Sequence, residues 1–281
     1  MDFFINEILE NKDLKRILIN YERKEEAKQV AQSIINGDRP DIENGIFPLC
    51  VLAYLAPYAL ELNNKKGIAK DITVKTLKDV NVWIDNYFNC YNELGLGEFH
   101  WLINHYTGDL FRLGRLQFRL EKSLVGIPEG EYAIETHIPQ GEALTEEKCL
   151  DSFKEATAFF KKYFPQTPVK YFMCDSWLLN PNLADILGEN SNIVKFMRLW
   201  TPVPFASDNS LQAIERVFGF GFKRDNIKNA PENTSLQKAL KGYLLSGGNI
   251  DLTLGWRPVL SCPHHRGRDT DDLENYLLNS V

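Results

Sequence analysis

The sequence has 281 residues, 44% of them hydrophobic and 25% charged, which is the composition of a globular protein and excludes a disordered chain. That length suffices for one large domain or two ordinary domains. The formal net charge of -6 argues against a general nucleic-acid binder, because such proteins are usually basic.

Cysteine usage and the apolar segments favour a cytoplasmic protein. The five cysteines are widely spaced, odd in number and without a CxxC pair, so we expect neither a disulfide framework nor a zinc site. The N-terminus lacks the basic and apolar regions of a signal peptide. The most apolar run, residues 47–62, is short for a membrane span and contains Pro57, so we expect a buried, kinked core helix and no membrane partner.

Residues 1–108 are predicted to be helical. Apolar residues recur at spacings of three and four in Lys24–Gly37 and again in Thr73–Cys90. A last short helix is expected at Phe99–Tyr106. Strand patterns are scarce in this part of the chain.

The pattern changes near Leu110. Apolar and polar residues alternate in 116–121 and again in 132–138, around a Pro128-Glu129-Gly130 turn, which predicts an antiparallel hairpin. The patterns that follow predict helices at 145–163, 183–187, 191–197, 210–218, 235–245 and 269–278, and strands at 169–176, 198–203 and 249–256. We therefore predict a helical domain at residues 1–109 and a mixed α/β domain at residues 110–281.

Several well-known motifs are absent from the sequence. It contains no GxxxxGK[ST] phosphate loop, no strand-linked GxGxxG, no GxSxG and no HExxH. The five histidines form no recognisable ligand set, so no metal is expected. The glycine-rich residues 219–223 and the CPHHRGR segment at residues 262–268 are interpreted as an ordinary turn and a polar tail.

His137 is the leading candidate for chemistry. It is predicted to lie at the end of a strand, on the same face as Glu135, before a turn containing Pro139 and Gly141. A histidine in this position can exchange a proton near neutral pH, and the carboxylate of Glu135 could raise its basicity. The alternative is a structural histidine that hydrogen bonds to a turn carbonyl.

Two further groups are candidates for ligand binding. Arg112, Arg115 and Gln117 offer donors that can hold carboxylate or phosphate groups, whereas Arg119 is expected to pair across the hairpin with Glu131 or Glu135. The second group, which follows a buried strand, comprises Asp175, Ser176, Trp177 and Asn180. Cys174 is interpreted as buried packing rather than as a nucleophile. The amides at Asn190–Ile193, at a helix start, could hold an anion.

The segments LFRLGRLQF, HIPQGEAL, CDSWLL and SNI, read in that order, resemble a bacterial family of N-acyltransferases. The resemblance extends over nearly the whole chain. It implies an α+β protein in which a helical N-terminal domain precedes a GNAT-like acyltransferase domain with a largely antiparallel central sheet.

The resemblance also implies acyl transfer from acyl-CoA or acetyl-CoA to an amine of a small molecule or peptide. His137 or Glu135 would act as the base, and the strand near Cys174–Ser176 would splay and supply an oxyanion donor. Such enzymes typically hold the CoA pyrophosphate in a Q/R-x-x-G-x-G/A loop, but residues 177–193 contain none. The residues expected at the CoA site are Ser176, Asn190, Ser191 and Asn192, and those expected at the acceptor site are Arg112, Arg115, Gln117, Trp177 and Asn180.

Two alternatives remain open. One is a non-catalytic binding or regulatory module on a degenerate GNAT scaffold, which the missing loop favours. The other is a small-molecule hydrolase that uses Cys174 or His137. The sequence specifies neither the acceptor nor the oligomeric state.

Overall fold

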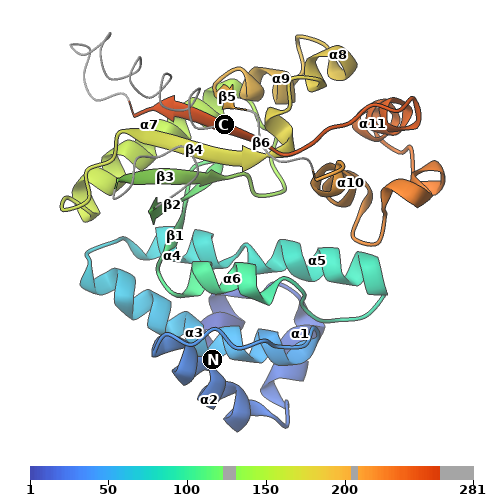
Figure 1. Ribbon diagram of the computed structural model, residues 1–281. Helices are drawn as coiled ribbons and strands as arrows, with labels where there is room; N and C mark the ends of the chain where they lie inside the picture. Colours follow the sequence, from blue (N-terminus) through green and yellow to red (C-terminus); the bar gives the residue numbers. More distant parts are fainter. Residues whose placement is uncertain (123–130, 204–207, 260–281) are drawn as a thin grey trace. The chain divides into compact units, whose positions relative to one another are not determined.

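The computed structural model describes residues 1–122, 131–203 and 208–259 (Figure 1). The chain divides into two compact units, one of Met1–Leu113 with Pro139–Gly141 and one of Gly114–Ile138 with Glu142–Val281. The predicted domain boundary after residue 109 lies just before strand β1 (Leu110–Leu113), which belongs to the first unit.

The first unit is helical, as predicted for residues 1–108. Its helices are η1 (Phe4–Ile8, a π-helix), α1 (Lys12–Ile19), α2 (Lys24–Ile35), α3 (Ile46–Lys65), α4 (Lys70–Leu77), α5 (Val80–Tyr91) and α6 (Phe99–Tyr106). Their apolar faces form one core, in which residues as far apart as Phe4 and Tyr106 are fully buried. Each large apolar side chain buried in this way stabilises the unit by about 1.5–3 kcal/mol.

Helix α3 forms the centre of this core, as its composition predicts. By length and composition it could cross a membrane, yet 56% of its most apolar window is buried. A helix that is apolar on all sides suits a core position surrounded by other helices. Pro57 lies inside the helix.

The predicted helix Thr73–Cys90 is wrong, because the chain breaks into α4 and α5 around Asp79. The Asp79 carboxylate is buried, accepts a hydrogen bond from Trp83 Nε1 (3.0 Å) and lies 3.3 Å from His105 Nε2. A buried charge must be paired. The break therefore follows from placing this carboxylate beside α6, a tertiary requirement that apolar periodicity does not encode.

The second unit contributes five strands to a mixed sheet, in the order β2-β3-β4-β6-β5. The strands are β2 (Leu116–Lys122), β3 (Tyr132–His137), β4 (Tyr171–Ser176), β5 (Thr201–Val203) and β6 (Thr253–Pro258). Strands β3 and β4 run parallel, whereas the pairs β2–β3, β4–β6 and β5–β6 are antiparallel. The predicted hairpin and the predicted α+β fold with a largely antiparallel sheet are confirmed.

Helix α7 (Glu146–Tyr163) connects the parallel strands and covers one face of the sheet (Figure 1). It begins at Thr145, whose hydroxyl accepts a hydrogen bond from the Lys148 amide. The ring of Phe153 packs edge-on against Phe118 of β2 and Phe172 of β4. Strand pleating consequently directs Glu135 and His137 of β3 to the opposite face.

The remaining helices form a second apolar cluster in this unit. They are η2 (Trp177–Leu179), α8 (Leu183–Leu187), α9 (Asn192–Met197), α10 (Leu211–Phe218), η3 (Arg224–Asn229) and α11 (Ser235–Leu245). The last strand begins at Thr253 and not, as predicted, at Asn249, because residues 249–251 bond to the start of α10 instead. The predicted turn at residues 128–130, the 262–268 segment and the 269–278 helix lie outside the described residues.

Candidate functional site

Three polar side chains meet on the face of the β2–β3 hairpin that α7 does not cover. The His137 Nε2 atom lies 3.1 Å from Oε2 of Glu135, and the same oxygen accepts a hydrogen bond from Arg119 Nε. Arg119 lies opposite Glu135 in the strand register and also contacts Glu121 at 3.0 Å. The predicted cross-strand pairing of Arg119 with Glu135 is therefore confirmed.

Glu135 is a carboxylate that stays ionised. Burial opposes its ionisation, but the hydrogen bond and charge of His137 and the charge of Arg119 outweigh burial and lower the pKa of Glu135 to about 2. Its side chain is only 13% exposed and that of His137 is 22% exposed. A fixed negative charge at this distance can orient the imidazole ring.

The pairing of β3 with β4 ends just before His137, and this unpaired stretch is called the opening below. Strands β3 and β4 share two registered pairs, Ile134↔Phe172 and Glu135↔Met173, although both strands continue beyond them. By contrast, β4 and β6 are paired over six residues. In the described part of β4, the backbone beyond Met173 is thus unbridged toward β3, and unbridged strand edges can hydrogen bond to an extended ligand.

Asp175 of β4 faces this opening from the same side of the sheet as His137. Partial burial, followed by the negative charges of Glu135 and Asp208, raises the pKa of Asp175 to about 6. The sequence places Asp175 in a polar cluster after a strand but gives no sign of this titration. The signal is a tertiary one, the approach of three carboxylates from separate segments.

The predicted arginine group does not gather at His137. Arg112 belongs to the first unit, where its charge helps to lower the pKa of Asp79. Arg115 is buried, and its Nε donates to the Glu142 carbonyl at 2.8 Å. Gln117 is buried opposite His137 in the hairpin register, so it is the member of this group that the second unit brings to His137.

The polar residues after β4 hold the local chain together. The Ser176 hydroxyl accepts from the Leu178 amide, and Asn180 Nδ2 donates to the Asp251 carbonyl at 3.0 Å. Trp177 is 6% exposed and packs in the apolar cluster of the surrounding helices. Burial also raises the pKa of the fully enclosed Cys174 thiol well above its usual value, which argues against a nucleophilic cysteine.

The sequence after β4 contains no phosphate-binding loop, but the topology puts the strand-to-helix loop of the parallel pair elsewhere. The crossover between the parallel strands is β3–α7–β4, so the strand-to-helix loop at the carboxyl edge is residues 138–145. The first turn of α7 carries Glu146 and Glu147, which disfavour an anion there. The first turn of α9 carries no acid, and the Ser191 hydroxyl already accepts from the Ile193 amide. The CoA site at Asn190, Ser191 and Asn192 stays a prediction.

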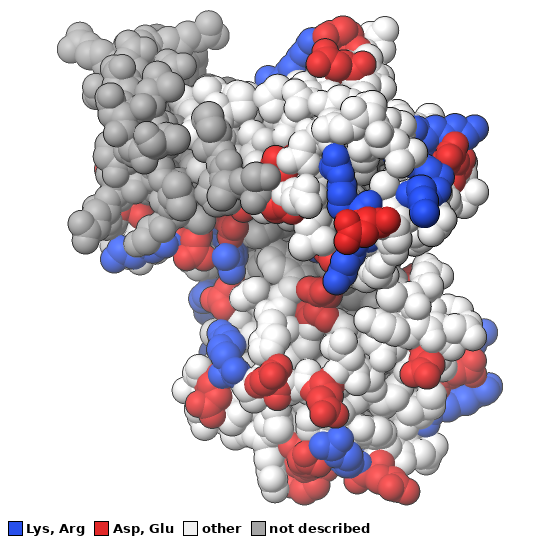
Figure 2. Space-filling model, turned by 45° about the vertical axis from the view of Figure 1, so that its right-hand side comes forward, with Lys and Arg blue, Asp and Glu red and all other residues white. Residues whose placement is uncertain are grey.

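Other features carry less chemistry. Within the described residues, no three His, Cys, Asp or Glu side chains could hold a metal ion. Figure 2 shows Lys and Arg interspersed with Asp and Glu on the described surface of the view, rather than gathered into one basic patch.

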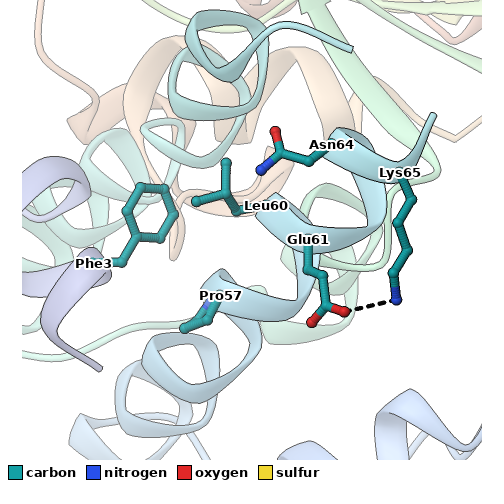
Figure 3. A pocket seen from close by; sticks show the side chains of 6 residues that line it. All are labelled: Phe3, Pro57, Leu60, Glu61, Asn64 and Lys65. Atoms are coloured by element: carbon teal, nitrogen blue, oxygen red, sulfur yellow. Dashed lines mark ion pairs between the residues drawn. The ribbon is translucent and has the colours of Figure 1, made fainter. Parts of the chain in front are cut away.

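A pocket of about 430 Å³ in the first unit is lined by Phe3, Pro57, Leu60, Glu61, Asn64 and Lys65 (Figure 3). None of the predicted site residues lines it, so the candidate site rests on the chemistry around His137.

Comparisons with known proteins agree with this architecture. A family model for an N-acyltransferase N-terminal domain matches residues 5–108, and a model for a GNAT-like C-terminal domain matches residues 110–257. Comparison with curated proteins finds no match.

Solved acyltransferases share the fold. One in complex with decanoyl-CoA and teicoplanin is 23% identical, with a TM-score of 0.73 over 89% of this chain and 81% of that chain. A mutant acyltransferase in complex with octanoyl-CoA is 21% identical, with a TM-score of 0.77 and coverages of 91% and 86%. A third, in complex with decanoyl-CoA, is 24% identical, with a TM-score of 0.74 and coverages of 89% and 84%. At these identities the likeness is one of fold.

Proposed function

This chain belongs to the family that joins an N-acyltransferase N-terminal domain to a GNAT-like C-terminal domain, and we propose that it transfers an acyl group from acyl-CoA to an amine of a small molecule or peptide. The observation that carries the proposal is the His137–Glu135 pair at the end of β3, beside the opening between β3 and β4. This arrangement supplies a base next to an edge that can hold an extended ligand.

His137 is the proposed general base. Its imidazole accepts a proton from the acceptor nitrogen, whose lone pair forms the new C–N bond at the thioester carbonyl. The C–S bond breaks, and the thiolate of CoA takes up a proton. The net reaction converts an ammonium group and a thioester into an amide, free CoA and one proton released to solvent. A well-placed general base accelerates such a step by about 10²–10⁴-fold.

Glu135 is proposed to position His137 rather than to act as the base. With a pKa of about 2, its carboxylate holds a proton too weakly to deprotonate an amine near neutral pH. The hydrogen bond from Arg119 reinforces this assignment, because it occupies the same oxygen that faces His137. Glu135 therefore orients the ring.

The opening between β3 and β4 is proposed to receive the arm of acyl-CoA. That arm contains two amide groups, which can pair with a strand edge as another strand would. Solved acyltransferases of the same fold bind decanoyl-CoA and octanoyl-CoA, which supports an acyl-CoA as the donor. One of them is also in complex with teicoplanin. A cytoplasmic location is part of the proposal, and the four described cysteines are free thiols.

Thermal unfolding with added acyl-CoA tests the donor assignment. Acetyl-CoA, octanoyl-CoA and decanoyl-CoA are titrated against the full chain, with free octanoate as the control that lacks CoA. A donor present at 100 times its Kd should stabilise the folded state by about 2.7 kcal/mol and raise the midpoint. His137→Ala should show the same rise, because it alters the base and not the opening. The absence of a shift with all three donors would rule out acyl-CoA-dependent transfer.

A non-catalytic binding module remains the second candidate. The first turn of α7 favours this candidate. It carries Glu146 and Glu147, whose negative charges disfavour a pyrophosphate at the loop that joins β3 to α7. This candidate predicts that acyl-CoA or an amine binds without amide formation. Product analysis therefore separates the two functions.

A further inference from the structure

Asp175 occupies a distinctive position beside the proposed base. Asp175 lies two residues past Met173 on β4, as His137 lies two residues past Glu135 on β3, and the two side chains are near enough for their charges to interact. Both side chains lie on the face that α7 does not cover, and Asp175 is exposed to solvent. The carboxylate is thus accessible to a dissolved molecule that approaches the opening.

The three carboxylates of this region differ in their partners. Glu135 is bonded to Arg119 and faces His137. Asp208 accepts hydrogen bonds from three backbone amides, those of Ser210, Gln212 and Leu252. Asp175 makes neither a hydrogen bond nor an ion pair with its side chain to any residue that the structure describes.

An unpaired carboxylate next to two others is electrostatically unfavourable. Partial burial, followed by the negative charges of Glu135 and Asp208, raises the pKa of Asp175, and the charge of His137 compensates only in part. A cation placed beside Asp175 would remove this repulsion and complete the set of partners. The acceptor in amide formation arrives as such a cation, because alkylamines are protonated at neutral pH.

We propose that Asp175 binds the ammonium group of the acceptor and presents its nitrogen to His137. This inference rests on the proposed function, and it specifies the acceptor as a primary alkylamine that is cationic in solution. A carboxylate favours the charged amine, so Asp175 contributes to binding and not to deprotonation. Loss of Asp175 should therefore raise KM for the acceptor while kcat changes little.

The binding test uses n-butylammonium chloride as the probe and ¹⁵N-labelled full chain as the protein. Butylammonium should shift backbone amide signals of β3 and β4 near His137 and Asp175, whereas 1-butanol should not. Asp175→Asn should raise the half-saturating concentration at least tenfold. Asp185→Asn is the matched control, because Asp185 is an exposed acid on α8 that carries no part of the site.

The outcomes separate this inference from the proposed function. Butylammonium shifts that depend on Asp175 support the cation site even if no acyl-CoA binds. Equal saturation in the wild type and in Asp175→Asn, or no shift near β3 and β4, overturns the cation site even if acyl-CoA stabilises the protein. In transfer assays, a tenfold rise in the KM of butylamine without a matching fall in kcat is expected for Asp175→Asn, and an unchanged KM would contradict the assignment.

Discussion

The imidazole of His137 and the carboxylate of Glu135 lie two residues apart on β3, with Nε2 and Oε2 separated by 3.1 Å. Arg119 from the neighbouring strand contacts the same carboxylate oxygen. This geometry makes Glu135 an ionised partner for His137 across the neutral pH range. It also ties the stability of the hairpin to the protonation of one carboxyl group.

Glu135 should make the protein sensitive to acid. Its pKa is about 2 in the folded state and about 4.3 in an unfolded chain, so its stabilising effect is present above about pH 4.3 and is lost as the pH falls toward 2. The full effect is on the order of 2–3 kcal/mol. Urea unfolding at several pH values should show this loss in the wild type and lack it in Glu135→Gln. Glu147→Gln, an exposed acid of α7, should retain the wild-type profile.

Asp175 should titrate near pH 6, as followed by the ¹³C signal of its carboxyl group. Glu135→Gln should lower this midpoint, because it removes a neighbouring negative charge. A raised folded-state pKa means that ionised Asp175 is less favourable in the folded than in the unfolded chain. Asp175→Asn should therefore increase the free energy of unfolding above pH 6 and have little effect below pH 4. A midpoint near the usual value of about 3.9 would contradict the arrangement of the three carboxylates.

Asp79 should be essential for the first unit. Removing one partner of a buried pair leaves the other without compensation and costs about 3–5 kcal/mol, so Asp79→Ala should lower the free energy of unfolding by that amount. Asp71→Ala breaks an exposed contact to Lys75 and should cost less than about 1 kcal/mol. Similar losses for the two variants in chemical unfolding would show that the Asp79–His105 contact is not a structural requirement.

Gly255 should tolerate no side chain. A Cβ atom there would lie 2.6 Å from Leu179 Cδ1 and 3.0 Å from Trp200 Cβ, so Gly255→Ala should destabilise the second unit by about 1–3 kcal/mol. Gly242 on α11 has open space around the equivalent position. Gly242→Ala should stabilise the protein by about 0.5–1 kcal/mol, because glycine is a poor residue inside a helix. Thermal unfolding should therefore show a lower midpoint for Gly255→Ala and a higher midpoint for Gly242→Ala than for the wild type.

Local patterns predict most of the fold. Apolar periodicity locates α2, α7 and α11, and alternation locates the β2–β3 hairpin with His137 and Glu135 on one face. What the sequence does not predict depends on long-range pairing. The break at Asp79 requires His105 of α6, and the late start of β6 requires Ser210 before α10.

The candidate site shows the same division. The His137–Glu135 pair follows from two-residue spacing on a strand. The opening between β3 and β4 does not follow from local spacing. It depends on the pairing of two strands that lie 34 or more residues apart in the sequence. The raised pKa of Asp175 likewise depends on long-range contacts, because Glu135 and Asp208 approach it from other segments. Trp177 and Asn180 lie near the end of a strand, where ligand contacts are common. Instead, Trp177 packs in the apolar cluster, and Asn180 donates a hydrogen bond to the Asp251 carbonyl.

The most direct test of the central claim is amide formation from octanoyl-CoA and n-butylamine, followed by mass spectrometry of the amide and by release of free CoA thiol. The wild type should produce amide and thiol in equal amounts, and His137→Ala should lower kcat by about 10²–10⁴-fold while acyl-CoA still raises its unfolding midpoint. Equal rates for His137→Ala and the wild type would contradict the role of His137 as the base. Thiol release without amide would contradict N-acyl transfer itself.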